Sequence, residues 1–153
     1  MHLSAVAAMV VALPGLLEAH AAPQRLPAEF SDVRWHVGST VFGDFTCRGR
    51  QDMAIFGVSE KSGFVVVVHP NGKTGKPSYA SFATRGRDPL NMRLTVESLE
   101  LSTDEASKGE QEYLPPDLTP SKTCKGLALG DGETDSHHIY WSRSKRALRS
   151  WSL

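Results

Sequence analysis

The sequence predicts a mainly β protein, folded as a small single-domain antiparallel sheet or sandwich with at most short helices. Two apolar runs, residues 53–58 and 64–69, are separated by a loop of hairpin length. Residues 91–97 alternate between apolar and polar side chains, as a strand with one solvated face does. Three further strands, separated by turns, are predicted over residues 126–129, 137–142 and 147–153.

Residues 1–21 are expected to be a secretory signal peptide. The apolar run 3–17 is too short to span a bilayer as a helix, and Ala19 and Ala21 form a small-x-small pattern that predicts cleavage after Ala21. An uncleaved membrane anchor is the alternative, against which the Pro14-Gly15 break argues. Residues 22–153 would then be one domain, periplasmic or extracellular, with no transmembrane segment in the mature chain.

Charge and cysteine content narrow the possible functions. The chain has 17 basic and 17 acidic residues, a balance that argues against a general binder of nucleic acid or anionic membrane. Two cysteines in an exported chain predict one disulfide, Cys47 to Cys124. A closed loop of about 78 residues would stabilise the fold by roughly 4 kcal/mol. Zinc binding by the two thiols is the alternative, but the close spacing typical of such sites is missing.

The first half of the chain is expected to form the centre of the sheet. Residues 27–33 could be a short helix, and 34–41 could as easily be a strand. The hairpin of residues 53–69 is apolar on both faces, which places it in the middle of the sheet. Residues 70–72 form a turn before a short strand over 79–83.

The second half contains an irregular strand and a long loop. Met92, Leu94 and Val96 should share one face, and a β-bulge near Ser98 would explain why Leu99 changes phase. Residues 102–123 are polar and proline-containing, which predicts a long loop ordered only near its end, where Cys124 tethers it.

One stretch of the chain resembles a known repeat. Gly43-Asp44-Phe45, followed by Gly49, Asp52, Ala54 and Gly57, is similar to a single FG-GAP or VCBS-type repeat, a family that builds β-propeller blades and binds calcium. The resemblance implies that Asp44 and Asp52 are the outer calcium ligands. Arg48, however, stands where the family has an aspartate, so we predict a salt bridge from Arg48 to Asp44 or Asp52 in place of the ion. A single repeat cannot close a propeller.

The C-terminal part carries a second resemblance. Cys124-Lys125-Gly126-Leu127, then the acidic segment 131–135 and the strand at 138–141, resemble small exported bacterial proteins of an uncharacterised family. The resemblance implies a fold family and a compartment, and it implies no particular chemistry.

The polar residues before the penultimate strand are the remaining candidates for metal binding or catalysis. Asp131, Glu133 and Asp135 alternate like the front of a calcium loop, although Asp-Gly is also a common turn dipeptide. His137 and His138 should point to opposite faces of a strand, and either one could form an acid–base pair with Asp135. No motif supplies a nucleophile, so a small hydrolase or a calcium-dependent module is the alternative function.

We therefore predict an exported, non-catalytic binding or structural module without a cofactor, whose partner is an unidentified protein or glycan of the cell envelope. Tyr140, Trp141 and Trp151 are expected in the core, or as anchors for a partner if they are exposed. Four cations near the end of the chain are interpreted as a solvated hairpin tip, with an acidic partner or lipid headgroups as the alternative: Arg143, Lys145, Arg146 and Arg149.

Overall fold

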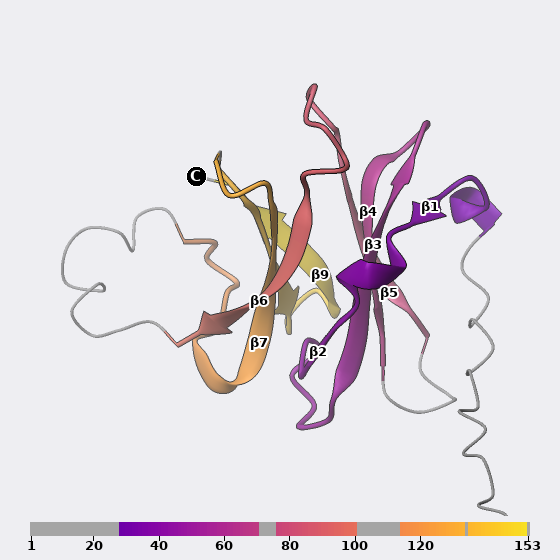
Figure 1. The fold of residues 1–153 in the computed structure, drawn as a ribbon. Coiled ribbons are helices and arrows are strands. Elements are labelled where there is room, and N and C mark those ends of the chain that lie inside the picture. The colour runs from indigo at the N-terminus through magenta and orange to yellow at the C-terminus, as the bar shows by residue number, and fades with distance from the viewer. Residues whose placement is uncertain (1–27, 71–75, 101–113, 134, 153) are drawn as a thin grey trace, which may run out of the picture.

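The computed structural model describes residues 28–70, 76–100, 114–133 and 135–152. Within these residues the chain forms two antiparallel sheets, as predicted, and its helical elements there are two short 3-10 turns, η1 (Ala28–Phe30) and η2 (Val37–Ser39). Figure 1 shows the sheets as two layers. No helix in this described part of the chain is long and apolar enough to cross a membrane. The predicted signal segment lies outside the described residues.

The N-terminal sheet is built around the predicted central hairpin. Its strands are β1 (Arg34–Trp35), β2 (Val41–Gly43), β3 (Asp52–Ser59), β4 (Gly63–His69) and β5 (Ser78–Phe82). Strands β3 and β4 pair along their whole length, β5 adds to β4, and β1 and β2 pair with β3 one after the other. The region 34–41, predicted as one strand, is therefore split by the η2 turn. The helix predicted at 27–33 is only the η1 turn in the described residues.

The C-terminal sheet has the order β6-β7-β8-β9. Its strands are β6 (Arg93–Leu99), β7 (Ser121–Gly130), β8 (His137–Ser142) and β9 (Ala147–Trp151). The predicted bulge is confirmed, because the register of β6 against β7 shifts between Ser98 and Leu99. The expectation that strand structure starts at residue 126 was wrong. β7 begins at Ser121, because the shift lets Leu99 pair with it.

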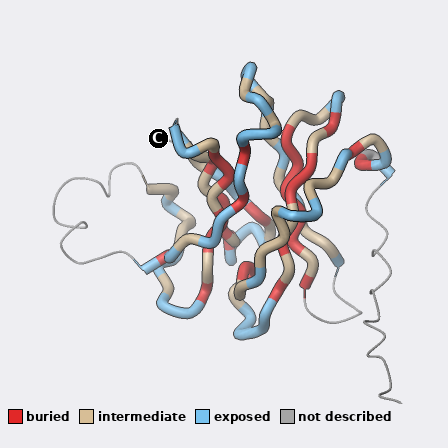
Figure 2. The backbone as a smooth tube through the Cα atoms, in the orientation of Figure 1, coloured by how far each residue is buried: buried red, intermediate tan, exposed pale blue. Residues whose placement is uncertain are grey.

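The two sheets pack face to face over one shared core. Buried residues from both sheets form the core: Phe45, Ala54, Phe56, Phe64, Val66, Val68, Met92, Leu94, Leu127, Leu129, Ile139 and Leu148. Val96 departs from the predicted buried face, since it is 43% exposed. Phe30 and Val33 cover the other face of β4 at Val65 and Val67, which explains why that strand is apolar on both sides. Figure 2 shows this burial concentrated on the central strands.

Two outer strands of the N-terminal sheet lie beside the outer strands of the C-terminal sheet. β5 runs next to β9, and β2 runs next to β6. The described residues thus form a sandwich that is nearly closed along both sides. At one end of it, the loop between β2 and β3, the start of β5 and the β8–β9 turn come together.

Candidate functional site

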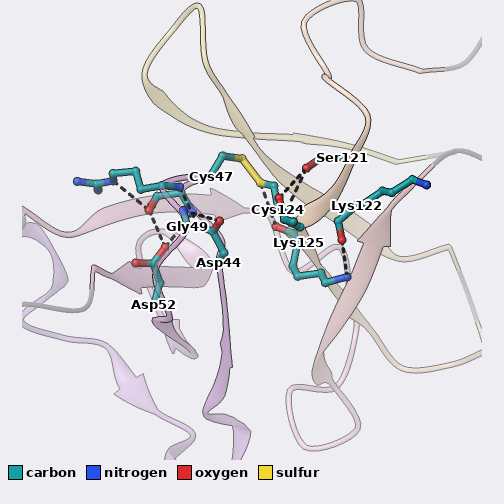
Figure 3. The surroundings of a disulfide bond; sticks show 11 residues. Asp44, Cys47, Gly49, Asp52, Ser121, Lys122, Cys124 and Lys125 are labelled. Atoms are coloured by element: carbon teal, nitrogen blue, oxygen red, sulfur yellow. Dashed lines mark hydrogen bonds between the residues drawn. A yellow bond between two sulfur atoms is a disulfide. The ribbon is translucent and has the colours of Figure 1, made fainter.

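The loop between β2 and β3, residues 44–51, is organised by two carboxylates. The Asp44 carboxylate accepts hydrogen bonds from the backbone N–H groups of Arg48 and Gly49, each at 2.8 Å. Asp52 is buried and accepts bonds from the Thr46 backbone N–H at 2.9 Å and the Thr46 hydroxyl at 2.6 Å. Figure 3 shows both carboxylates turned toward the loop backbone. The two aspartates therefore fix the loop by satisfying its amides.

The Arg48 side chain does not bond to Asp44 as predicted. Its Nε donates to the Thr46 hydroxyl at 3.1 Å, and that hydroxyl in turn donates to Asp52. The only hydrogen bond between Arg48 and Asp44 uses the arginine's backbone N–H. Of the two partners predicted for the Arg48 side chain, Asp44 is not the one it contacts, because the tight turn brings the amide, rather than the guanidinium, to this carboxylate. Toward Asp52, the other predicted partner, the guanidinium is linked through the Thr46 hydroxyl. The guanidinium is left directed along the loop, where it is exposed.

The predicted disulfide joins this loop to the C-terminal sheet. Cys47 and Cys124 are bonded, with their Cα atoms 4.8 Å apart, so the bond links the β2–β3 loop to β7 (Figure 3). Beside it, the Lys125 backbone N–H donates to the Asp44 carbonyl at 3.0 Å. Cys124 is buried against Leu99 and Tyr140. The loop is therefore held at a fixed position at one end of the sandwich.

A basic groove opens next to the disulfide. It has a volume of about 780 Å³ and is lined by Thr46, Cys47, Arg48, Lys76, Pro77, Ser78, Trp141, Arg143 and Arg146. Four of these side chains are cations, all four are exposed, and none of the lining residues is acidic. They come from three separate segments: the β2–β3 loop, the start of β5, and the β8–β9 turn. We refer to these residues as the basic groove.

The backbone of the basic groove is unusual at two positions. Three non-glycine residues of the described chain have positive φ, and two of them, Cys47 at 55° and Arg146 at 52°, line the groove. Such backbone costs on the order of 1 kcal/mol for a residue with a side chain, and it tends to occur at functional sites. Here the two positions lie in two of the three segments that line the groove, the β2–β3 loop and the β8–β9 turn.

The two histidines lie on opposite faces of β8, as predicted. His138 Nδ1 is 2.8 Å from the Glu97 carboxylate, and its ring stacks on Trp151 with centroids 4.8 Å apart. The Glu97 hydrogen bond raises the pKa of His138. The sequence did not reveal this partner, since Glu97 is 41 residues away and reaches the histidine over Gly126, where a Cβ atom would lie 2.8 Å from its carboxylate.

His137 faces the interior. It is buried, stacks on Phe82 with ring centroids 4.6 Å apart, and its Nε2 has no hydrogen-bond partner among the described residues. Burial lowers the pKa of His137, and Arg87 and Arg85 add to this effect. Within the described chain, no serine or cysteine side chain bonds to either histidine. The Asp135 carboxylate also acts to raise the pKa of His138, but the hydrogen-bond partner of the ring is Glu97.

In the acidic segment, the described residues 131–133 bend at Gly132 and Glu133. Asp131 accepts a hydrogen bond from the Glu133 backbone N–H at 3.1 Å, and Gly132 has a φ of 82°. Glu133 and Asp135 are exposed. Among the described residues, no three His, Cys, Asp or Glu side chains are grouped closely enough to hold a metal ion, and this includes Asp44 and Asp52. Three of the carboxylates considered as calcium ligands, those of Asp131, Asp44 and Asp52, accept hydrogen bonds from the backbone of their own loops.

The three aromatic residues singled out in the sequence have different environments. Tyr140 is buried on the outer face of the C-terminal sheet, and its hydroxyl donates to Asp117 at 2.5 Å. Burial, together with the Asp117 carboxylate, raises the pKa of Tyr140 to about 12. Trp151 packs edge-on against Tyr140 and is half-buried. Trp141 is also half-buried, packs against the shared core and lines the basic groove.

Comparisons with known proteins leave the geometry as the guide to function. Scans against protein-family models, curated proteins and solved structures gave no match. The resemblance of residues 43–57 to an FG-GAP repeat therefore stays a resemblance of sequence. The basic groove is the site with the most distinctive chemistry among the described residues.

Proposed function

We propose that the protein is a non-catalytic binding module that acts in the periplasm or outside the cell and holds an anionic ligand in the basic groove. The observation that carries the proposal is the set of four cations, Arg48, Lys76, Arg143 and Arg146, around one opening with no acidic side chain among its described lining residues. Like charges brought together on a folded surface repel one another, and an anionic ligand relieves that repulsion.

The total charge of the chain makes this local concentration more informative. With 17 basic and 17 acidic residues, the protein has no general excess of positive charge to spread over its surface. Mutation of a cation that binds the ligand in the groove should therefore weaken binding more than mutation of a cation elsewhere on the surface. Lys145 offers the comparison, because it is exposed on the same β8–β9 turn but does not line the groove.

The groove walls are pre-organised, which favours binding over a solvated, mobile surface. The Arg48 segment is fixed by Asp44, Thr46 and the disulfide. In the β8–β9 turn, the Ser142 hydroxyl accepts the Lys145 backbone N–H at 3.2 Å. A ligand that meets cations carried on a fixed backbone loses less free energy to ordering of the protein. The disulfide also supports an oxidising compartment, in keeping with export.

The test compares the binding of anionic polymers to three proteins at low salt by calorimetry: the wild type, Arg143→Glu and Lys145→Glu. The two variants change net charge equally and lie on one turn. We expect Arg143→Glu to weaken binding by about tenfold or more, equivalent to about 1.4 kcal/mol, and Lys145→Glu by less than about threefold. Equal losses in the two variants would mean that the groove has no special role, and the proposal would be abandoned.

A further inference from the structure

We infer that the ligand of the basic groove is an acidic glycan, a chain of sugar rings that carry carboxylate or sulfate groups. The inference rests on the proposed function and concerns the same groove. It follows from three properties of the lining: one aromatic side chain placed among cations, polar side chains that are mainly hydrogen-bond donors, and a predominance of arginine over lysine.

Trp141 gives the groove an apolar surface at a fixed position. The residue lies in β8, pairs with Leu148 of β9 and packs against the shared core, while its half-buried side chain also lines the groove. Trp combines a large, rigid apolar area with little conformational freedom. The C–H face of a pyranose ring matches such a surface, whereas inorganic phosphate or polyphosphate has no apolar part to place there.

The polar lining excludes a neutral sugar as the preferred ligand. Arg and Lys side chains only donate hydrogen bonds, and no Asp, Glu, Asn or Gln is among the described residues that line the groove. The lining side chains with an acceptor oxygen are Thr46 and Ser78. The Thr46 hydroxyl is already engaged with Arg48 and Asp52. Sugar hydroxyls both donate and accept, so a neutral glycan would have Ser78 as an acceptor for one of its donors and would leave most of the others unmatched. A carboxylate or sulfate only accepts, which fits the lining.

The identity of the cations points the same way. Three of the four are arginines, whose planar guanidinium binds carboxylate and sulfate oxygens in pairs. They occupy segments on different sides of a groove of about 780 Å³, more room than a single small anion needs. A ligand with repeated acidic groups, separated by sugar rings, can reach several cations and Trp141 together.

Other polyanions fit less well. A nucleic-acid binder would be expected to have a basic domain, and this chain has equal numbers of acidic and basic residues. An acidic peptide is flexible, so binding it costs the free energy of ordering its backbone. A glycan chain is stiffer and brings a ring face to Trp141 with each acidic group.

The experiment follows binding by tryptophan fluorescence and calorimetry, with the wild type and Trp141→Phe as a matched pair. The probes are polygalacturonate (carboxylated), heparin (sulfated), dextran (neutral), polyglutamate and a single-stranded oligonucleotide. We expect one of the two acidic glycans to bind most tightly and to change the fluorescence. In Trp141→Phe that change should be lost and affinity should fall about fivefold or more, while a cooperative melting transition above the assay temperature confirms that the variant is folded. The preferred acidic glycan identifies carboxylate or sulfate as the recognised group.

The outcomes separate this inference from the proposed function. If polyglutamate or the oligonucleotide binds more tightly than both acidic glycans, and Arg143→Glu weakens that binding, the groove is an anion site but the glycan inference is wrong. Dextran binding as tightly as the acidic glycans also overturns the inference. If Trp141→Phe leaves acidic-glycan affinity unchanged, the stacking argument fails. If no probe binds, or if Arg143→Glu and Lys145→Glu weaken binding equally, the proposed function itself fails.

Discussion

Removing the disulfide should destabilise the fold by a predictable amount. Cys47 and Cys124 are separated by 77 positions, and the bond cross-links the β2–β3 loop to β7. In the chain-entropy model, opening a loop of this length costs about 4 kcal/mol, because the unfolded chain regains the freedom that the bond removes. A domain of this size shifts its Tm by about 3–4 °C for each kcal/mol. We therefore expect Cys47→Ala/Cys124→Ala to melt about 12–16 °C below the wild type.

The assay is differential scanning calorimetry of the double alanine variant, the oxidised wild type and the wild type reduced by a phosphine. Using both alanines avoids a lone reactive thiol. The reduced wild type should melt close to the variant, and the variant should not respond to reductant. A loss below about 5 °C in both samples would refute the reasoning. It would mean that the Lys125–Asp44 backbone bond and the loop carboxylates hold the sheets together without help from the cross-link.

Three further predictions concern packing, pH and calcium. In Gly57→Ala, the new Cβ would lie 2.5 Å from Val33 Cγ1 and 2.8 Å from a backbone carbonyl oxygen, so the free energy of unfolding, measured in urea, should fall by about 1–3 kcal/mol. Gly38→Ala is the control: the new Cβ would have open space around it, and the free energy of unfolding should change little. For Glu97→Gln, the loss of Tm relative to the wild type should be largest below pH 6.5, because the carboxylate stabilises protonated His138. This loss should shrink as the pH rises through the raised folded-state pKa of His138, and a loss that does not change between pH 5.5 and 9 would contradict this pairing. The wild-type Tm should be the same in calcium and in chelator, because the Asp44 oxygens accept hydrogen bonds from amides, while the Tm of Arg48→Asp should rise in calcium. A shift of several degrees in the wild type would mean that this loop does bind calcium.

The sequence was a good guide where burial alone sets the structure. The apolar run at Val65 to Val68 requires cover on both faces, and the fold supplies it from the shared core and from Phe30. The start of β7 was missed because its first residues are polar and partly exposed, so they lack an apolar pattern. Their strand structure depends on a pairing with β6 that is set by the bulge.

The sites were harder to predict because they are made by residues far apart in the chain. Each groove cation, taken alone, reads as an ordinary solvated side chain, and only the fold brings Lys76 beside Arg143. The Glu97–His138 pair depends on the absence of a side chain at Gly126, which no local pattern connects with either partner. The disulfide was predictable because the chain has two cysteines and therefore one possible intramolecular bond.

The side-by-side arrangement of β5 with β9, and of β2 with β6, has a consequence for how the protein behaves at high concentration. A strand at the end of a sheet offers unpaired amides and carbonyls to which another molecule can add a strand, the first step of polymerisation. Here a second copy that approaches the end of either sheet meets a strand of the other sheet as well, and β5 is preceded by Lys76 and Pro77, a charge and a residue without an N–H. This arrangement thus guards β2, β5, β6 and β9 against edge-to-edge self-association.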